Sequence, residues 1–432
     1  MQKMSPTANK EYPFGKGQAH FILVVTCLLY LINYMDRQVF SVVQEPMRLA
    51  LGLTDTQCGI IQTAFVAGMG LFSLPLAYVV DRWSRKKAIG IMAILWSGFT
   101  FLTGLGKNFV TLLVPRTFVG LGEAGFTSGG TPLITTAYPK RMRATVLGIF
   151  NIVVPLGSAV GMALGGFIAV KYNSWSAPFF FFAIPGIIVG IMAFFLKDYK
   201  TVPAVKGKDQ KSESFFSSAL SLLKIPSLLR LYIGYIMLQI MFISILTWLP
   251  TYMIRAQDIK ADLAGLLTGV IGLMGIVGAF LGGVLADKWQ KTNPRARMLV
   301  PAIAMVTGAA CMIAAFVFNV QGIGYVLACL FGVFSTVALP PLTAVTQDVT
   351  PLEKRGQAWG MNVLLANLLG AAWAPVLIGL LSDALGAGAN GLKTALLIST
   401  SFGIIAGIFF FLSSRHYPRD AARISQLAAA NE

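Results

Sequence analysis

The hydrophobic pattern of the chain consists of long apolar segments separated by short polar loops. A helix needs about 20 mostly apolar residues to cross the hydrocarbon core of a membrane. Segments of this kind are predicted at 19–44, 58–80, 88–106, 109–137, 144–170, 177–196, 229–254, 263–286, 298–318, 322–346, 357–381 and 392–413. The pattern therefore predicts an all-α polytopic membrane protein with twelve transmembrane helices.

A polar connector at 197–228 divides these segments into two sets of six. We expect its part near Phe215–Leu223 to form either a short amphipathic helix on the inner membrane face or a plain tether. The predicted domains are a tail at 1–18, a six-helix bundle at 19–196, the connector, a six-helix bundle at 229–413 and a tail at 414–432.

Composition supports a membrane protein and excludes a soluble one. Only 12% of the 432 residues are charged and 56% are hydrophobic, whereas soluble domains carry about 25% charged residues. The net charge of +17 is spread over short loops, so we expect no nucleic-acid partner. Most Lys and Arg residues lie in loops on the side of the two termini, which predicts that both termini are cytoplasmic. We expect an integral protein of a bacterial inner membrane.

The sequence contains no pattern typical of an enzyme or a metal site. There are two histidines, no Walker motif and no pair of closely spaced cysteines. The four cysteines are expected to be small residues within membrane helices: Cys27, Cys58, Cys311 and Cys329. We therefore predict a protein that is not an enzyme and that has neither metal nor cofactor.

Two loops six segments apart share a signature. The loop AYVVDRWSRKK follows the second segment and GVLADKWQKTNPR follows the eighth, so an internal duplication is predicted. We predict a gating role for the shared charges, which would bind a neighbouring helix end in one transport state; the alternative is a charge cluster that only fixes topology. The residues are Asp81, Arg82, Arg85, Lys86, Asp287 and Lys288.

Four charged residues lie within the predicted membrane helices of the first half. They are Asp36 and Arg37 in LINYMDRQVF and Arg116 and Glu123 in PRTFVGLGEAGF. Such residues are costly in a membrane and are functional candidates by default. Asp36 lies roughly 24 Å and Arg116 roughly 20 Å from the inner face at 1.5 Å per residue, so we expect them to face each other. Glu123 is expected about 10 Å nearer the inner face.

These charges suggest proton coupling. A buried carboxylate can exchange a proton when its distance from a cation changes. Asp36 and Glu123 are therefore the predicted proton-coupling residues, driven by a proton gradient, and Arg116 together with Arg37 is predicted to bind an anionic substrate. The alternative is a set of structural ion pairs that fix the register of the helices.

Further substrate contacts are predicted in the second half. An unpaired amide is costly inside a membrane helix, so amides there should face a wet cavity or form a hydrogen bond between helices. Trp and Tyr near helix ends can instead be interface anchors. The candidates are Gln239, Trp248, Tyr252, Asn362 and Asn367.

Several motifs together resemble one family. LINYMDR, GIIQTAF, DRWSRK, RTFVGLGEAG, IVVPLGSAVG and VTPLEKRGQAWGMNVLLANLLGAAWAPVLIGLLSD are similar to the spinster branch of the major facilitator superfamily. The resemblance implies two six-helix bundles and coupling roles for Asp36, Arg116 and Glu123. It also implies lysophospholipids or sphingoid phosphates as substrates. The stretch TWLPTYM is more similar to the anion:cation symporter branch, which takes up organic acids.

The sequence therefore predicts a proton-coupled secondary transporter with alternating access. The expected substrate is an anionic amphiphile such as a lysophospholipid, and the expected form is a monomer in the bilayer. Two alternatives remain open, namely a proton-coupled symporter of sugar acids or other carboxylates, and a sensor on a transporter fold that transports nothing.

Overall fold

The computed structural model describes residues 12–198 and 221–429, and every regular element in these ranges is helical. The N-terminal half contains α1 (Lys16–Leu51), α2 (Asp55–Arg82), α3 (Arg85–Gly104), α4 (Phe109–Glu123), α5 (Phe126–Ala137), η1 (Lys140–Met142), α6 (Arg143–Lys171) and α7 (Ala177–Ala193). The C-terminal half contains α9 (Pro226–Gln257), α10 (Ala261–Gln290), α11 (Ala296–Val317), α12 (Ile323–Val337), α13 (Leu339–Asp348), η2 (Leu352–Lys354), α14 (Arg355–Leu365), η3 (Ala366–Ala371), α15 (Ala374–Ala384), α16 (Ala389–Ser414) and α17 (Tyr417–Ala429).

The helices have the length and composition of membrane spans. Within the described ranges, ten helical stretches are long and apolar enough to cross a membrane, and α7 is a shorter apolar helix. The 28-residue α2 supplies the remaining crossing. The prediction of an all-α chain with twelve crossings is confirmed.

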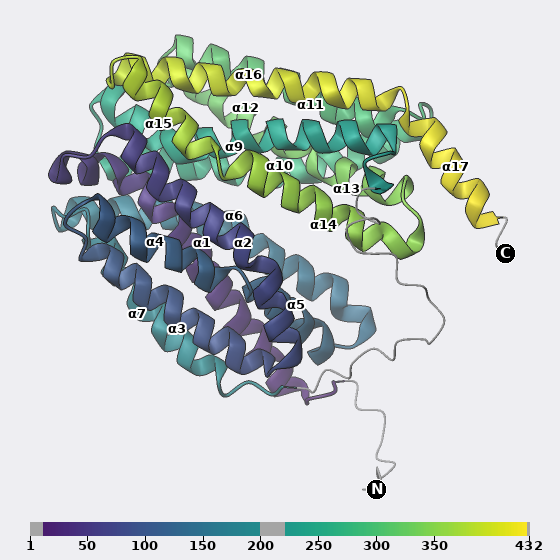
Figure 1. Cartoon of the computed structure of the whole chain (residues 1–432), viewed down its shortest axis with the longest axis horizontal. Helices are drawn as coiled ribbons and strands as arrows, with labels where there is room; N and C mark the ends of the chain where they lie inside the picture. The colour runs from purple at the N-terminus through teal and green to yellow at the C-terminus, as the bar shows by residue number, and fades with distance from the viewer. Residues whose placement is uncertain (1–11, 199–220, 430–432) are drawn as a thin grey trace, which may run out of the picture.

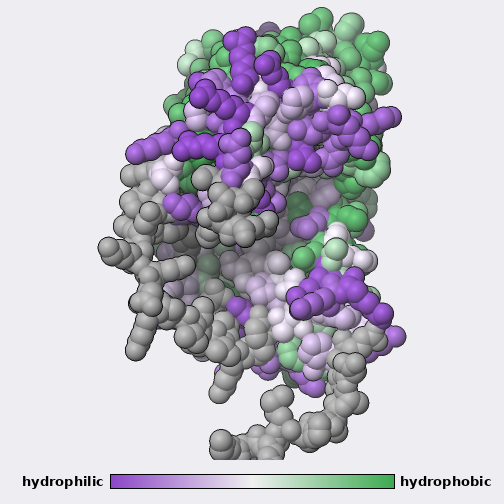
Figure 2. Space-filling view, turned by 90° about the vertical axis from the view of Figure 1, so that its right-hand side faces the viewer, coloured by the Kyte–Doolittle hydropathy of each residue, from purple (hydrophilic) through white to green (hydrophobic). Residues whose placement is uncertain are grey.

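The two halves lie side by side as separate helical bundles (Figure 1). The start of α1 and the helix α17 lie at the same end of the molecule, which we call the terminal end; the opposite one is the far end. In Figure 2, which looks at the terminal end, polar side chains gather on both halves and the visible surface between them is recessed. Apolar side chains are most extensive along the upper and right-hand edges of this view, as expected for surfaces that contact lipid.

Small residues allow the helices within a half to approach closely. In α6, glycine recurs at 157, 161 and 165, on the side that packs against α1. A Cβ atom at Gly161 would lie 2.5 Å from the Cα atom of Met35. Close contact between backbones is a main source of helix association where lipid replaces water. The glycines of α6 therefore set the position of α1, which carries Asp36 and Arg37.

Gly161→Val is expected to lower the thermal unfolding midpoint of the detergent-solubilised protein. The added side chain must push α1 away, and overpacking of this kind costs about 1–3 kcal/mol. Gly148→Val in the same helix is the matched control, since nothing lies within 4 Å of the Cβ position there. Equal midpoints for the two variants would contradict this account of the packing.

Three predicted spans are interrupted rather than continuous. The segment 109–137 is divided into α4 and α5 at Ala124 and Gly125, and glycine has a low helix propensity. The segment 322–346 is divided at Ala338, ahead of two prolines that cannot donate backbone hydrogen bonds. The segment 357–381 contains the π-helix η3, four residues before Pro375. Hydropathy alone shows none of these breaks.

The ends of the chain and of α1 also differ from the prediction. α1 continues to Leu51, beyond the predicted end at 44, because its polar last turns pack against the C-terminal half. The predicted tail at 414–432 contains the helix α17. Most of the predicted amphipathic helix of the connector lies outside the described residues.

Candidate functional site

A cavity of about 680 Å³ lies between the two halves. This volume is within the range of sites that bind small organic molecules. Its walls come from α1, α2 and α6 on one side and from α9, α10, α12, α13, η3 and α15 on the other. The cavity is therefore at the place where alternating movement of two bundles would expose a substrate to either side of a membrane.

The two sides of the cavity differ in chemistry. The wall from α9 and α10 is largely apolar and includes Phe242, Ile243, Leu246 and Ile276. Polar amides lie on the wall of the first half at Gln38, Gln62 and Asn151, and in the second half at Gln239 of α9 and Asn367 of η3. Among the described lining residues, Arg37 is the one charged side chain. The cavity thus offers a single cation opposite an apolar wall.

Arg37 is held in place by a buried carboxylate. Its Nε atom donates a hydrogen bond of 2.7 Å to Oε2 of Glu123, whose side chain is fully buried. The guanidinium also lies 4.6 Å from the ring centroid of Tyr34. An anion that reaches Arg37 from the cavity therefore competes with Glu123 for the same cation.

Asp36 and Arg116 form a second ion pair, as the depth estimate predicted. Nη1 of Arg116 lies 3.6 Å from Oδ1 of Asp36, and both side chains are almost completely buried. The hydroxyl of Thr100 donates a hydrogen bond to the other carboxylate oxygen of Asp36. The four membrane charges of the first half thus form two adjacent pairs.

Arg116 is enclosed by aromatic rings and is not among the residues that line the cavity. Its Cζ atom lies 5.1 Å from the ring centroids of Phe40 and Phe65 and 5.9 Å from that of Phe179. Such cation–π contacts partly replace the hydration of a buried cation. The arginine predicted to bind substrate is therefore shielded in this conformation.

Only two of the five predicted contacts in the second half lie in the cavity wall, namely Gln239 and Asn367. Trp248, Tyr252 and Asn362 are not among its lining residues in this conformation. The indole of Trp248 donates to the Pro375 carbonyl oxygen at 3.2 Å within the core. The Tyr252 hydroxyl contacts Asn319, and Asn362 is fully buried. Hydropathy identified these residues as unusual but could not show which way they face.

The predicted gating residues lie at the terminal end. α2 continues through Asp81 and Arg82, so these belong to a helix rather than a loop, and the Arg82 guanidinium lies 4.1 Å from the Tyr78 ring centroid. Arg85 is buried at the start of α3, where the Ser84 hydroxyl donates to Asp198 at 2.6 Å. The Lys86 backbone N–H donates to the same carboxylate.

The equivalent loop of the second half makes different contacts. Arg297 bridges Asp287 at 2.9 Å and Asp348 at 2.8 Å, all within the C-terminal half. Lys288 is exposed. The described contacts of the two loops therefore differ in this conformation although the loops share a sequence signature, and their gating role stays a prediction.

An ion cluster that was not predicted from the sequence joins the two halves at the far end. Arg255 of α9 donates to Glu45 of α1 at 2.6 and 2.8 Å and to Asp55 of α2 at 2.6 and 2.7 Å. Arg48 pairs with Glu45 at 2.9 Å. Both carboxylates are buried. We call Glu45, Arg48, Asp55 and Arg255 the far-end cluster.

A second contact across the halves lies beside the far-end cluster. The Asp383 carboxylate accepts hydrogen bonds from the backbone N–H groups of Asp55 and Thr56 at 3.2 and 2.8 Å. An acidic group at a helix N-terminus is favoured by the helix dipole. The backbones also touch here, because a Cβ atom at Gly379 would lie 2.4 Å from the Asp55 carbonyl oxygen. The far end is thus closed in this conformation.

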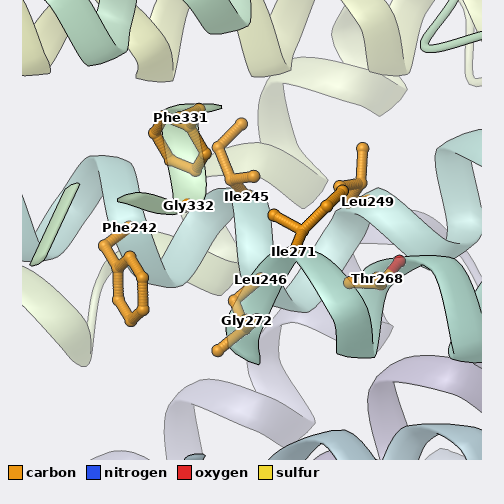
Figure 3. A pocket seen from close by; sticks show the side chains of 9 residues that line it. All are labelled: Phe242, Ile245, Leu246, Leu249, Thr268, Ile271, Gly272, Phe331 and Gly332. Carbon is orange, nitrogen blue, oxygen red and sulfur yellow. The ribbon is translucent and has the colours of Figure 1, made fainter. Parts of the chain in front are cut away.

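A small gap of about 10 Å³ adjoins the cavity between α9, α10 and α12 (Figure 3). Figure 3 shows mostly apolar side chains around it, with Thr268 as the one polar side chain drawn. Phe242, Leu246 and Gly272 line both spaces. The gap has the volume of about one water molecule, so it extends the apolar wall but is not a separate site.

Two bundles of six helices around a central cavity define a membrane transporter of the alternating-access type. The family model described as "Major Facilitator Superfamily" matches residues 26–375. The chain belongs to this superfamily, and the resemblance noted from its motifs is confirmed.

Individual relatives agree with this assignment. The chain is 25% identical to "Protein spinster homolog 1" of Xenopus tropicalis, covering 95% of this chain and 83% of that protein. It is 28% identical to the "Hexuronate transporter" of Bacillus subtilis (strain 168), covering 91% and 95%. The fold matches the crystal structure of a bacterial homologue of the human lysosomal transporter spinster, in an inward-facing and unoccupied conformation. That match has a TM-score of 0.84 and 22% identity, and covers 94% of this chain and 99% of that one. These relatives are transporters rather than enzymes.

Arg255→Gln is expected to open the far end. Breaking a buried ion pair costs about 3–5 kcal/mol, enough to shift a two-state population more than about tenfold. Spin labels on the exposed positions Leu49→Cys and Ile323→Cys, in a chain without other cysteines, would report the change. We expect a longer distance between the labels.

Arg297→Gln is the matched control, because Arg297 pairs only within the C-terminal half among its described contacts. It should leave the distance between the far-end labels unchanged. The same distances in the parent chain and in Arg255→Gln would show that the far-end cluster does not hold the halves together.

Proposed function

We propose that the protein is a proton-coupled secondary transporter of an anionic amphiphile, such as a lysophospholipid. The observation that carries this proposal is the single cation of the cavity, Arg37, bound to the buried Glu123 and opposite the apolar wall of α9 and α10. An anionic head would bind Arg37 and an apolar body would contact that wall. The similarity to spinster proteins supports the same substrate class.

The proposed cycle uses competition for Arg37. When an anionic head binds Arg37, Glu123 loses its partner inside a medium of low dielectric constant, so its charged form is disfavoured. Glu123 then takes up a proton, and substrate and proton travel together. Release of both restores the Arg37–Glu123 pair. Asp36 is a second carboxylate that can take up a proton, and in the present conformation it contacts Arg116 and accepts a hydrogen bond from Thr100.

We propose that both termini are cytoplasmic and that the molecule works as a monomer in a bacterial inner membrane. The excess of Lys and Arg in the loops of the terminal end supports this orientation. With the far end on the outside, the far-end cluster closes the outer entrance. The described conformation is then the inward-facing one.

A second candidate is a proton-coupled symporter of a sugar acid or another carboxylate. The observation in its favour is the set of amides on the cavity lining, which could bind hydroxyl groups. The similarity to the hexuronate transporter points the same way. A sensor that transports nothing would bind one of these anions without moving it. Flux measurements with lysophosphatidylglycerol and with glucuronate separate the three.

Glu123→Gln and Asp36→Asn are expected to abolish gradient-driven flux of lysophosphatidylglycerol in proteoliposomes. A pH difference of one unit across the membrane supplies about 1.4 kcal/mol per proton. This is enough for about tenfold accumulation of a substrate that moves with one proton. Each variant removes a proton-binding carboxylate while keeping a similar shape. Asp262→Asn is the control, because Asp262 lies at the start of α10 and its carboxylate, among the described residues, accepts a hydrogen bond from the N–H of its neighbour Leu263. Undiminished gradient-driven flux in both site variants would exclude this coupling scheme.

Leu246→Asn is expected to separate the two substrate classes. Removing an apolar contact of this size should weaken binding of lysophosphatidylglycerol by about tenfold, since a buried Leu contributes about 1.5–3 kcal/mol. Glucuronate has no apolar body, so its binding should change much less. Leu229→Asn, at an exposed position of the same helix, is the control. A larger loss for glucuronate than for the lysolipid would favour the sugar-acid transporter.

A further inference from the structure

Phe65 of α2 lies at the boundary between the cavity and the Asp36–Arg116 pair. It is one of the residues that line the cavity, and its ring centroid is 5.1 Å from Cζ of Arg116. Phe40 is at the same distance from Arg116 but is fully buried and does not line the cavity. Of the three rings around Arg116, Phe65 alone belongs both to the cavity and to the aromatic enclosure.

The backbone around Phe65 is held close to α4. Arg116 and Gly120 are four residues apart, so they share one face of that helix. A Cβ atom at Gly120 would lie 2.1 Å from the carbonyl oxygen of Phe65. The absence of a side chain at Gly120 therefore lets α2 come near enough for the Phe65 ring to contact the guanidinium.

The Arg116 guanidinium makes little use of its hydrogen-bonding capacity. Nε, Nη1 and Nη2 are all buried without a hydrogen-bond partner, and the nearest carboxylate oxygen is 3.6 Å away. A guanidinium has five N–H donors, and leaving such donors unsatisfied in a buried charged group is costly. An anion that reached Arg116 would gain strong bonds at a site that is already dehydrated.

We propose that Phe65 is a gate between the cavity and Arg116, and that turning of its ring makes Arg116 a second contact for the anionic head after Arg37. This rests on the proposed function, in which the head enters from the cavity. Transfer of the head to Arg116 would weaken the hold of Arg116 on Asp36. Phe65 would thereby link the occupancy of the cavity to the second carboxylate.

The test is binding of dodecyl phosphate, measured by titration calorimetry on the detergent-solubilised full chain. Phe65→Ala should bind dodecyl phosphate at least about tenfold more tightly. This gain in affinity corresponds to one added charge-assisted hydrogen bond. The gain should vanish when Asp36→Asn and Arg116→Gln are added, a change that removes both charges and leaves neither unpaired. Phe40→Ala is the matched control and should show no gain.

Weaker binding by Phe65→Ala, an equal gain with Phe40→Ala, or a gain that persists without Arg116 would each overturn the gate.

A second measurement needs no ligand. A chain with its four cysteines changed to serine and carrying Asp36→Asn and Arg116→Cys is labelled with a small water-soluble methanethiosulfonate. Labelling should be about tenfold faster with Phe65→Ala than with Phe65, and unchanged by Phe40→Ala.

The two measurements separate the gate from the proposed function. If no chain binds dodecyl phosphate but Phe65→Ala alone accelerates labelling, the gate stands and the amphiphile as substrate is wrong. If labelling is equally fast with Phe65 and with Phe65→Ala, the gate is wrong whatever the protein transports.

Discussion

The cost of placing a charge inside a membrane is the constraint on which this structure depends. Charged side chains there must be paired or must face water. The first half meets this condition by placing Arg37 against Glu123 and Arg116 near Asp36. Only Arg37 also lines the cavity. One pair is therefore open to a ligand and the other is enclosed by aromatic rings, although both come from the same two helices.

Depth counting along the helices was enough to predict that Asp36 and Arg116 face each other. Depth counting did not predict the pair of Arg37 with Glu123, because it places each side chain at the level of its Cα atom. Side chains of a helix lean toward its N-terminus. α1 and α4 run in opposite directions, so Arg37 and Glu123 lean toward each other. Their long side chains close a gap estimated at about two helical turns.

The rest of the site depends on contacts between distant residues, which a hydropathy pattern cannot predict. The far-end cluster joins residues about 200 positions apart, and the sequence analysis singled out none of its members. The one signal for it in the sequence was that acidic residues are scarce, 17 in the whole chain, and that two of them lie within seven positions of Arg48. Trp248 and Asn367 have similar claims as polar or aromatic residues within spans. The helix break around η3 places Asn367 in the cavity wall, and the packing of α9 places Trp248 in the core.

The central claim is that an anion and Glu123 compete for Arg37, so that binding is linked to proton uptake. Calorimetric titration with lysophosphatidylglycerol in two buffers of different ionisation enthalpy measures the protons exchanged on binding. The account predicts net proton uptake by the parent chain and a clear reduction of that uptake in Glu123→Gln. Tight binding with no proton exchange, or identical exchange in the two chains, would contradict it.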